Sequence, residues 1–109
     1  MTDLEIVRLC AEAMELQYHI ANIEDEHEVW VRLQPAKPPT IYSYRYDPIN
    51  DDAQCMALIK RFRLEILWQE EGETVRARYP WSVPDLMTGY YCDINRAVCL
   101  AVARMQADK

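Results

Sequence analysis

The spacing of apolar residues along the chain predicts a helix near each end. The first covers about 3–15, where apolar residues recur every three or four positions and Thr2 and Glu5 form a capping box. The last covers about 93–106, with Asp93 as its N-cap. It carries so few polar residues that we expect it to be buried on more than one side.

A third helix is predicted over about 52–62, after a turn that begins at Asp47. Asn50 or Asp51 is its N-cap, because these side chains accept hydrogen bonds from the first helical amides. The oxygens of Asn50, Asp51 and Asp52 also suit a hard cation, although capping accounts for them without a metal. The residues that this helix is expected to bury are Ala53, Met56, Ala57 and Ile59.

Alternating apolar and polar residues predict four strands. Two of them, over about 28–34 and 41–46, flank a proline-rich segment. The other two, over about 64–69 and 74–79, are expected to form a hairpin. The acidic residues 24–28 are expected to be a solvated loop.

The expected hairpin has a register that agrees with its hydrophobic pattern. A two-residue turn at Glu71–Gly72 places Trp68 opposite Val75 and Ile66 opposite Ala77. Because opposite residues lie on the same face of a sheet, these apolar side chains share one face. That face is expected to join the core.

Length and composition agree with one folded domain over residues 1–109. The chain has 109 residues, of which 50% are hydrophobic and 28% are charged, so it is unlike a disordered segment. The elements above predict an α+β fold. In it, a small and mainly antiparallel sheet, which includes the hairpin, is layered with the three helices.

Charge and hydropathy exclude two classes of function. The net charge of −6, from 18 acidic and 12 basic residues, disfavours binding to duplex nucleic acid. The longest apolar run is residues 97–103, whereas a membrane span needs about 20 residues. The opening residues lack the pattern of a signal peptide, so a cytoplasmic protein is expected.

The cysteines are expected to be reduced rather than paired or metal-bound. Cys10, Cys55 and Cys99 fall within predicted helices among apolar neighbours, which favours buried thiols. The spacing of the cysteines and of His19 and His27 does not match a zinc site, so no metal is expected.

Two segments carry a family resemblance. They are YDPINDDAQCMALI at 46–59 and DINRAVCLAVARM at 93–105. Together with the opening 2–10, they resemble small tailed-phage and prophage proteins that have the phage ABA sandwich domain. The resemblance implies an α-β-α layered module in the cytoplasm of a bacterial host. The family has no established reaction, so the resemblance implies no catalytic residue.

The chain carries no recognised catalytic motif. It has no GxSxG nucleophile elbow, no P-loop and no GxGxxG sequence. We therefore expect a non-enzymatic protein without a cofactor.

An aromatic loop over about 80–91 is the first candidate for a binding site. Large aromatic side chains on loops are enriched at protein interfaces. The residues expected to touch a partner are Trp81, Met87, Tyr90 and Tyr91. The alternative is that the loop folds back and buries Trp81 as a plug.

A small anion, such as a nucleotide, is the alternative ligand. Arg76 and Arg78 share one face of the expected hairpin and could clamp a phosphate, unless Glu65 opposite pairs with Arg78. Three tyrosines on one strand could stack on a base, unless they pack under a helix. They are Tyr42, Tyr44 and Tyr46.

These observations lead to two functional hypotheses. The first is a phage accessory protein that binds a host protein, with antagonism of an antiviral defence system as its most specific form. The second is a module that sequesters a nucleotide or another small anion, in which case subunits of a homo-oligomer could share the pocket.

Overall fold

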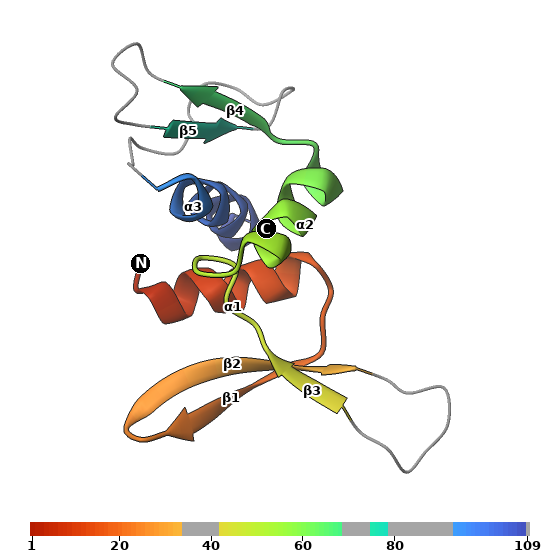
Figure 1. Cartoon of the computed structure of the whole chain (residues 1–109), viewed down its shortest axis with the longest axis vertical. Helices are drawn as coiled ribbons and strands as arrows, with labels where there is room; N and C mark the ends of the chain where they lie inside the picture. Colours follow the sequence, from red (N-terminus) through yellow and green to blue (C-terminus); the bar gives the residue numbers. More distant parts are fainter. Residues whose placement is uncertain (34–41, 69–74, 79–92, 109) are drawn as a thin grey trace.

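The computed structural model describes residues 1–33, 42–68, 75–78 and 93–108, with the backbone alone described at residues 33, 42, 68 and 75–78. In chain order the elements are α1 (Asp3–Ala13), β1 (Tyr18–Ile23), β2 (Glu26–Leu33), β3 (Tyr42–Arg45), α2 (Asp52–Phe62), β4 (Glu65–Trp68), β5 (Val75–Arg78) and α3 (Ile94–Ala107). We call α1, α2 and α3 the helical body. It lies between a β1-β2-β3 sheet and a separate β4-β5 sheet (Figure 1).

The α+β class expected from the sequence is confirmed. Within the described residues there are three helices, and every strand pair is antiparallel. The layering differs in one respect, because β4 and β5 form a sheet of their own instead of joining the other strands. The helical body therefore has a sheet on each side.

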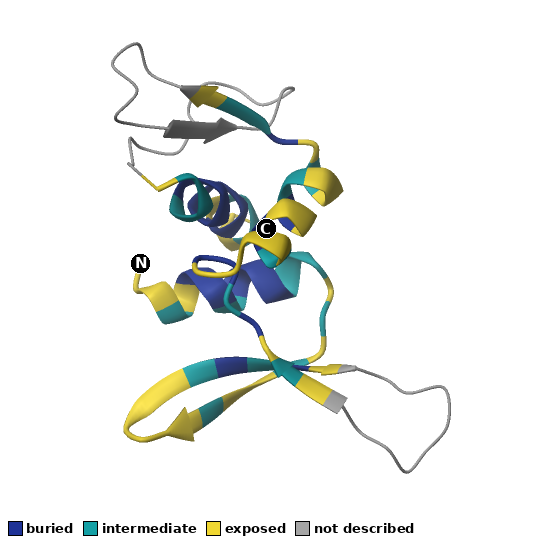
Figure 2. Ribbon diagram, in the orientation of Figure 1, coloured by how far each residue is buried: buried dark blue, intermediate teal, exposed yellow. Residues whose placement is uncertain are grey.

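The core is centred on α1 and α3, which pack against each other. All residues of α3 from Ala97 to Ala103 are buried, so the expected burial on more than one side is confirmed (Figure 2). The helix starts as expected, since the Asp93 side chain accepts a hydrogen bond from the Asn95 N–H at 3.0 Å. No described helix is long and apolar enough to span a membrane.

Helix α2 has the expected bounds but a different buried face. Asp51, rather than Asn50, is its N-cap and accepts a hydrogen bond from the Gln54 N–H at 2.9 Å. The expected burial of Ala53, Met56 and Ala57 is wrong, because all three are exposed. The helix packs against α3 through a stripe displaced around its axis. This stripe consists of the buried Cys55 and Leu58 with the half-buried Ile59 and Phe62.

The acidic segment 24–28 is not the solvated loop that the sequence suggested. Strands β1 and β2 form a hairpin whose turn is only Glu24 and Asp25. Both have positive φ, 51° and 66°, as a type I′ turn requires. Neither residue is the glycine that usually marks such a turn, which is why the sequence pattern did not reveal the hairpin.

The β4-β5 register is the one expected. Glu65 lies opposite Arg78, and Trp68 lies opposite Val75. Leu64, just before β4, is buried as the expected core face requires. The turn at 70–73 lies outside the described residues.

Three cysteines are free thiols buried in the helical body, as expected. The Cys10 thiol donates a hydrogen bond to the Cys99 carbonyl oxygen at 3.3 Å and so joins α1 to α3. The neighbouring Cys99 thiol, and then burial, raise the pKa of the Cys55 thiol far above its usual range. The Cys55 thiol is therefore protonated and inert at neutral pH. Cys92 lies outside the described residues.

Candidate functional site

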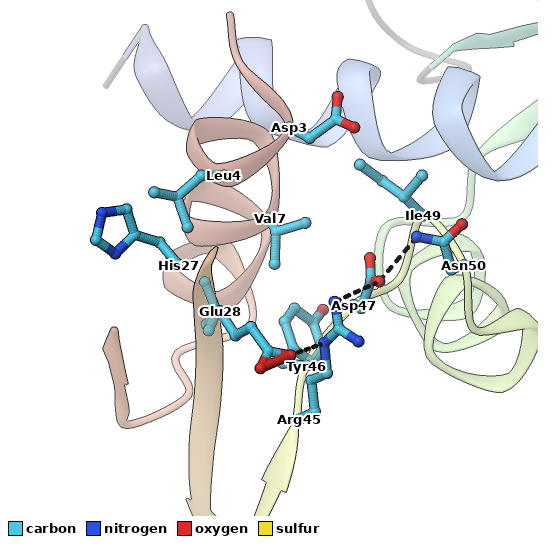
Figure 3. A pocket seen from close by; sticks show the side chains of 11 residues that line it. Asp3, Leu4, Val7, His27, Glu28, Arg45, Tyr46, Asp47, Ile49 and Asn50 are labelled. Atoms are coloured by element: carbon cyan, nitrogen blue, oxygen red, sulfur yellow. Dashed lines mark hydrogen bonds and ion pairs between the residues drawn. The ribbon is translucent and has the colours of Figure 1, made fainter. Parts of the chain in front are cut away.

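A cleft of about 140 Å³ opens where the chain leaves β3 and passes the first turns of α1 (Figure 3). We call it the acidic cleft. Its lining residues are Asp3, Leu4, Val7, His27, Glu28, Val29, Arg45, Tyr46, Asp47, Ile49 and Asn50. Leu4, Val7 and Ile49 supply apolar side chains, and carboxylates occupy much of the rest.

Backbone hydrogen bonds fix the segment that forms one wall of the cleft. The Tyr46 N–H donates to the Val29 carbonyl oxygen at 2.8 Å, which extends the β2-β3 pairing by one residue. The Gln54 side chain, from α2, accepts from the Asp47 N–H at 2.6 Å and donates to the Arg45 carbonyl oxygen at 3.0 Å. The cleft wall is thereby attached to both the sheet and the helical body.

Two carboxylates of the cleft converge on one guanidinium group. Glu28 Oε2 lies 2.7 Å from Arg45 Nε, and Asp47 Oδ2 lies 3.6 Å from an Arg45 terminal nitrogen. The carboxylate side chains are only 13% and 18% exposed, whereas that of Arg45 is 55% exposed. Asp47 Oδ2 also accepts a hydrogen bond from the Asn50 side-chain amide at 2.8 Å.

A third carboxylate, Asp3, stands at the start of α1. It forms a bidentate pair with Arg96 of α3, with distances of 2.6 and 3.0 Å. Hydrogen bonding from Arg96 lowers the pKa of Asp3, although burial opposes the shift. The cleft is thus lined by three carboxylates and one guanidinium group, that of Arg45. Arg96, which is not among the lining residues, pairs with Asp3, so one negative charge is left in excess.

Size and charge together limit what the cleft can hold. A volume of about 140 Å³ is below the roughly 300 Å³ at which pockets for drug-sized ligands begin. Apolar side chains beside carboxylates suit a hydrocarbon stem that ends in a cation, as in lysine and arginine. The arrangement can therefore bind a single basic side chain.

The two described tyrosines of the expected stacking surface, Tyr44 and Tyr46, pack toward the core. Tyr44 is half-buried against the core. Tyr46 is 3% exposed and follows β3 into the core, where burial raises the pKa of its hydroxyl well above the usual value. Its hydroxyl has no hydrogen-bond partner among the described residues. Tyr46 cannot stack on a bound base, and the side chain of Tyr42 lies outside the described residues.

Of the other expected binding residues, some are described only by their backbone and the rest lie outside the described residues. Arg76 and Arg78 lie opposite Leu67 and Glu65 in the β4-β5 register. The predicted anion clamp stays a prediction, because the two arginine side chains are not described. The predicted partner-binding residues, Trp81, Met87, Tyr90 and Tyr91, also lie outside the described residues.

Sequence reasoning did not assemble the acidic cleft. Glu28 lies at the boundary between the expected loop over 24–28 and the expected strand over about 28–34, and Asp47 begins an expected turn, so the pattern does not predict that either faces Arg45. Their only shared feature in the sequence is charge, and 17 positions separate Glu28 from Arg45. Recognition of the β1-β2 hairpin would have placed Glu28 on the strand that pairs with β3.

The chain does not offer a metal site among its described residues. No three His, Cys, Asp or Glu side chains there are placed to share an ion. Asp51 caps α2, and Asp52 Oδ1 accepts a hydrogen bond from the Asn95 side chain at 2.9 Å. Both carboxylates therefore have structural roles.

Comparison with known proteins found no matching family model, no matching curated protein and no matching solved structure. The resemblance to the phage ABA sandwich family stays a prediction from the quoted segments.

Proposed function

We propose that this protein acts by binding another protein, without catalysing a reaction, and that the acidic cleft receives one basic side chain of that partner. The observation that supports the proposal is the convergence of Glu28 and Asp47, both largely buried, on the single guanidinium of Arg45. Such a group of carboxylates attracts a second cation once Arg45 no longer satisfies all their oxygens.

Asp47 is the carboxylate that still has hydrogen-bond acceptor sites available to a partner. Its 3.6 Å separation from Arg45 is longer than a hydrogen bond, whereas the Glu28 separation of 2.7 Å is short and direct. A carboxylate has about four acceptor sites. A lysine or arginine from a partner can therefore contact Asp47 while Arg45 stays on Glu28.

The partner that we propose is a protein of a bacterial host. The resemblance to phage proteins supports a role during infection, and interference with an antiviral defence system is its most specific form. The net charge of −6 favours approach to a basic surface of the partner. Cytoplasmic residence follows from this proposal.

Native mass spectrometry of the purified chain with bacterial lysate tests the proposal. The wild-type protein is expected to form a stoichiometric complex with a host protein. A Glu28→Gln/Asp47→Asn variant is expected to lose it, because the cleft then has no negative excess. Glu24→Gln removes one charge at the exposed β1-β2 turn and serves as the matched control, which should keep the complex.

Two results would contradict this function. One is a complex that survives the Glu28→Gln/Asp47→Asn change while circular dichroism shows an intact fold. The other is a bound small molecule that is lost in Arg76→Ala or Arg78→Ala. The second result would support the alternative hypothesis of an anion-sequestering module, which otherwise stays a prediction.

A further inference from the structure

We propose that β1 is a dimerisation strand, which pairs antiparallel with β1 of a second copy of this chain to give one continuous six-stranded sheet. No residue of β1 lines the acidic cleft, which lies where the chain leaves β3, on the other side of β2.

Strand β1 is an edge without the usual protection. Among the residues that the structure describes, the order β1-β2-β3 leaves one side of β1 unpaired in the sheet (Figure 1). Proteins normally protect such edges with lysine, proline or a bulge. The six residues of β1, YHIANI, include no Asp, Glu, Lys, Arg or Pro, and their register with β2 is continuous.

The backbone of β1 presents three residues to a new strand. The Arg32 N–H donates to the Gln17 carbonyl oxygen at 3.0 Å, so residue 17 is hydrogen-bonded to β2. Hydrogen-bonding direction alternates along a strand. The backbone N–H and C=O groups of residues 19, 21 and 23 therefore also point toward β2. Those of Tyr18, Ile20 and Asn22 point away from β2, toward the open edge.

An antiparallel pair about a two-fold axis places one residue opposite the same residue of the second copy. Of the symmetric registers open to β1, the one centred on Ile20 pairs all three outward-facing residues. Ile20 is the middle one of the three, so Ile20 faces Ile20 of the second copy, and Tyr18 faces its Asn22. In this register all three outward-facing residues pair with the second copy. Because β1 contains no Asp, Glu, Lys or Arg, the pairing brings no like charges together.

Side-chain burial identifies the same centre. Ile20 lies directly opposite Val29 and on the same face, yet Val29 is 2% exposed and Ile20 is 46% exposed. Pairing about Ile20 creates an unbroken apolar row across four strands, from Val29 through both copies of Ile20 to the second Val29. A second copy therefore covers the apolar side chain that the single chain leaves open.

The test is sedimentation velocity of the full chain over a range of concentrations. We expect a concentration-dependent dimer in the wild type. Ile20→Lys should raise the dissociation constant by roughly tenfold or more, because two ammonium groups then meet across the axis. Ile23→Lys is the matched control, since Ile23 is similarly exposed at 43% but faces Gln17 of the second copy. Its dimer should persist.

Amide hydrogen exchange gives a readout that needs no variant. In the dimer, the amides of Tyr18, Ile20 and Asn22 should exchange more slowly as concentration rises, whereas those of His19 and Ala21 should be unaffected. A chain that stays monomeric, or a dimer in which these amides remain fast, overturns the proposal. So does protection that appears only when a different protein is added. None of these results bears on charge binding in the acidic cleft, so the two proposals fail separately.

Discussion

Helix α3 and strand β1 bury their apolar residues to very different degrees. Every side chain of α3 from Ala97 to Ala103 is enclosed by its neighbours, and four of these seven residues are alanine or cysteine. Strand β1 leaves Ile20 and Ile23 nearly half exposed. The helical body therefore provides most of the burial that stabilises the fold, whereas the β1-β2 hairpin extends beyond it (Figure 2).

This difference suggests that the helical body stabilises the fold, whereas the β1-β2-β3 sheet carries the proposed binding surfaces. Small side chains in α3 allow α1 and α2 to approach closely, and close packing of this kind tolerates little change. The sheet contacts the body through the buried Val29, Val31 and Tyr46 and the half-buried Tyr18 and Tyr44, whereas residues such as Ile20 and Ile23 stay exposed. Both proposed binding surfaces accordingly lie on the β1-β2-β3 sheet or at its junction with the body.

The largest expected effect comes from the helical body. Leu58→Ala should lower the free energy of unfolding by about 2–5 kcal/mol, because the Leu58 side chain of α2 is fully buried in the core. Met56→Ala, on the exposed face of the same helix, should change it by less than about 0.5 kcal/mol. Chemical denaturation measures both. A loss for Met56→Ala as large as that for Leu58→Ala would contradict the assignment of Leu58, rather than Met56, to the buried face of α2.

Removal of the α2 cap should have a smaller effect. Asp51→Ala loses the hydrogen bond to the Gln54 N–H and should cost about 1 kcal/mol of unfolding free energy. Asp51→Asn keeps an accepting oxygen and should cost little, which makes it the control in the same denaturation experiment. If both variants lose the same unfolding free energy, Asp51 stabilises the helix through its charge and not through its hydrogen bond.

A substitution at the junction between the β1-β2-β3 sheet and the helical body should raise the free energy of unfolding instead of lowering it. Tyr46→Phe removes a buried hydroxyl that has no hydrogen-bond partner among the described residues. Because burial of an unpaired polar group is unfavourable, the variant should be more stable by about 1 kcal/mol. Thermal and chemical unfolding measure the change. A loss of stability would reveal a partner for the hydroxyl.

The smallest effect should come from the ion pair between the exposed Asp3 and the half-buried Arg96. Hydrogen bonding from Arg96 lowers the pKa of Asp3, so the pair stabilises the fold at neutral pH and this contribution disappears as pH falls through the folded pKa. Asp3 is 64% exposed, so Asp3→Asn should cost less than about 1 kcal/mol at pH 7. The difference from wild type should shrink below about pH 4. A difference that grows in acid would contradict the assignment.

The sequence predicted well whatever depends on local pattern. The caps at Thr2 and Asp93, the bounds of α2 and the register of β4 with β5 all follow from side-chain types within a few positions. These features are set by hydrogen bonding and periodicity along one segment, which a sequence displays directly.

Features that depend on distant contacts were missed. The buried face of α2 was wrong because Met56 looks as apolar as Leu58, and only the position of α3 decides between them. The β1-β2 turn was missed because Glu24 and Asp25 adopt positive φ without a glycine. The acidic cleft depends on that turn, so it could not be anticipated.

The most direct test of the proposed function is a nuclear magnetic resonance titration of the free protein with capped Gly-Arg-Gly and with its neutral citrulline analogue. We expect the arginine peptide to shift the amides of Val29, Arg45 and Asp47 with a weak Kd of about 1–100 mM, because one partly exposed ion pair and the burial of one side-chain stem supply only a few kcal/mol. The citrulline peptide should leave them unchanged, and Glu28→Gln/Asp47→Asn should abolish the response. Equal shifts from both peptides, or none from either, would contradict a cleft that recognises a basic side chain.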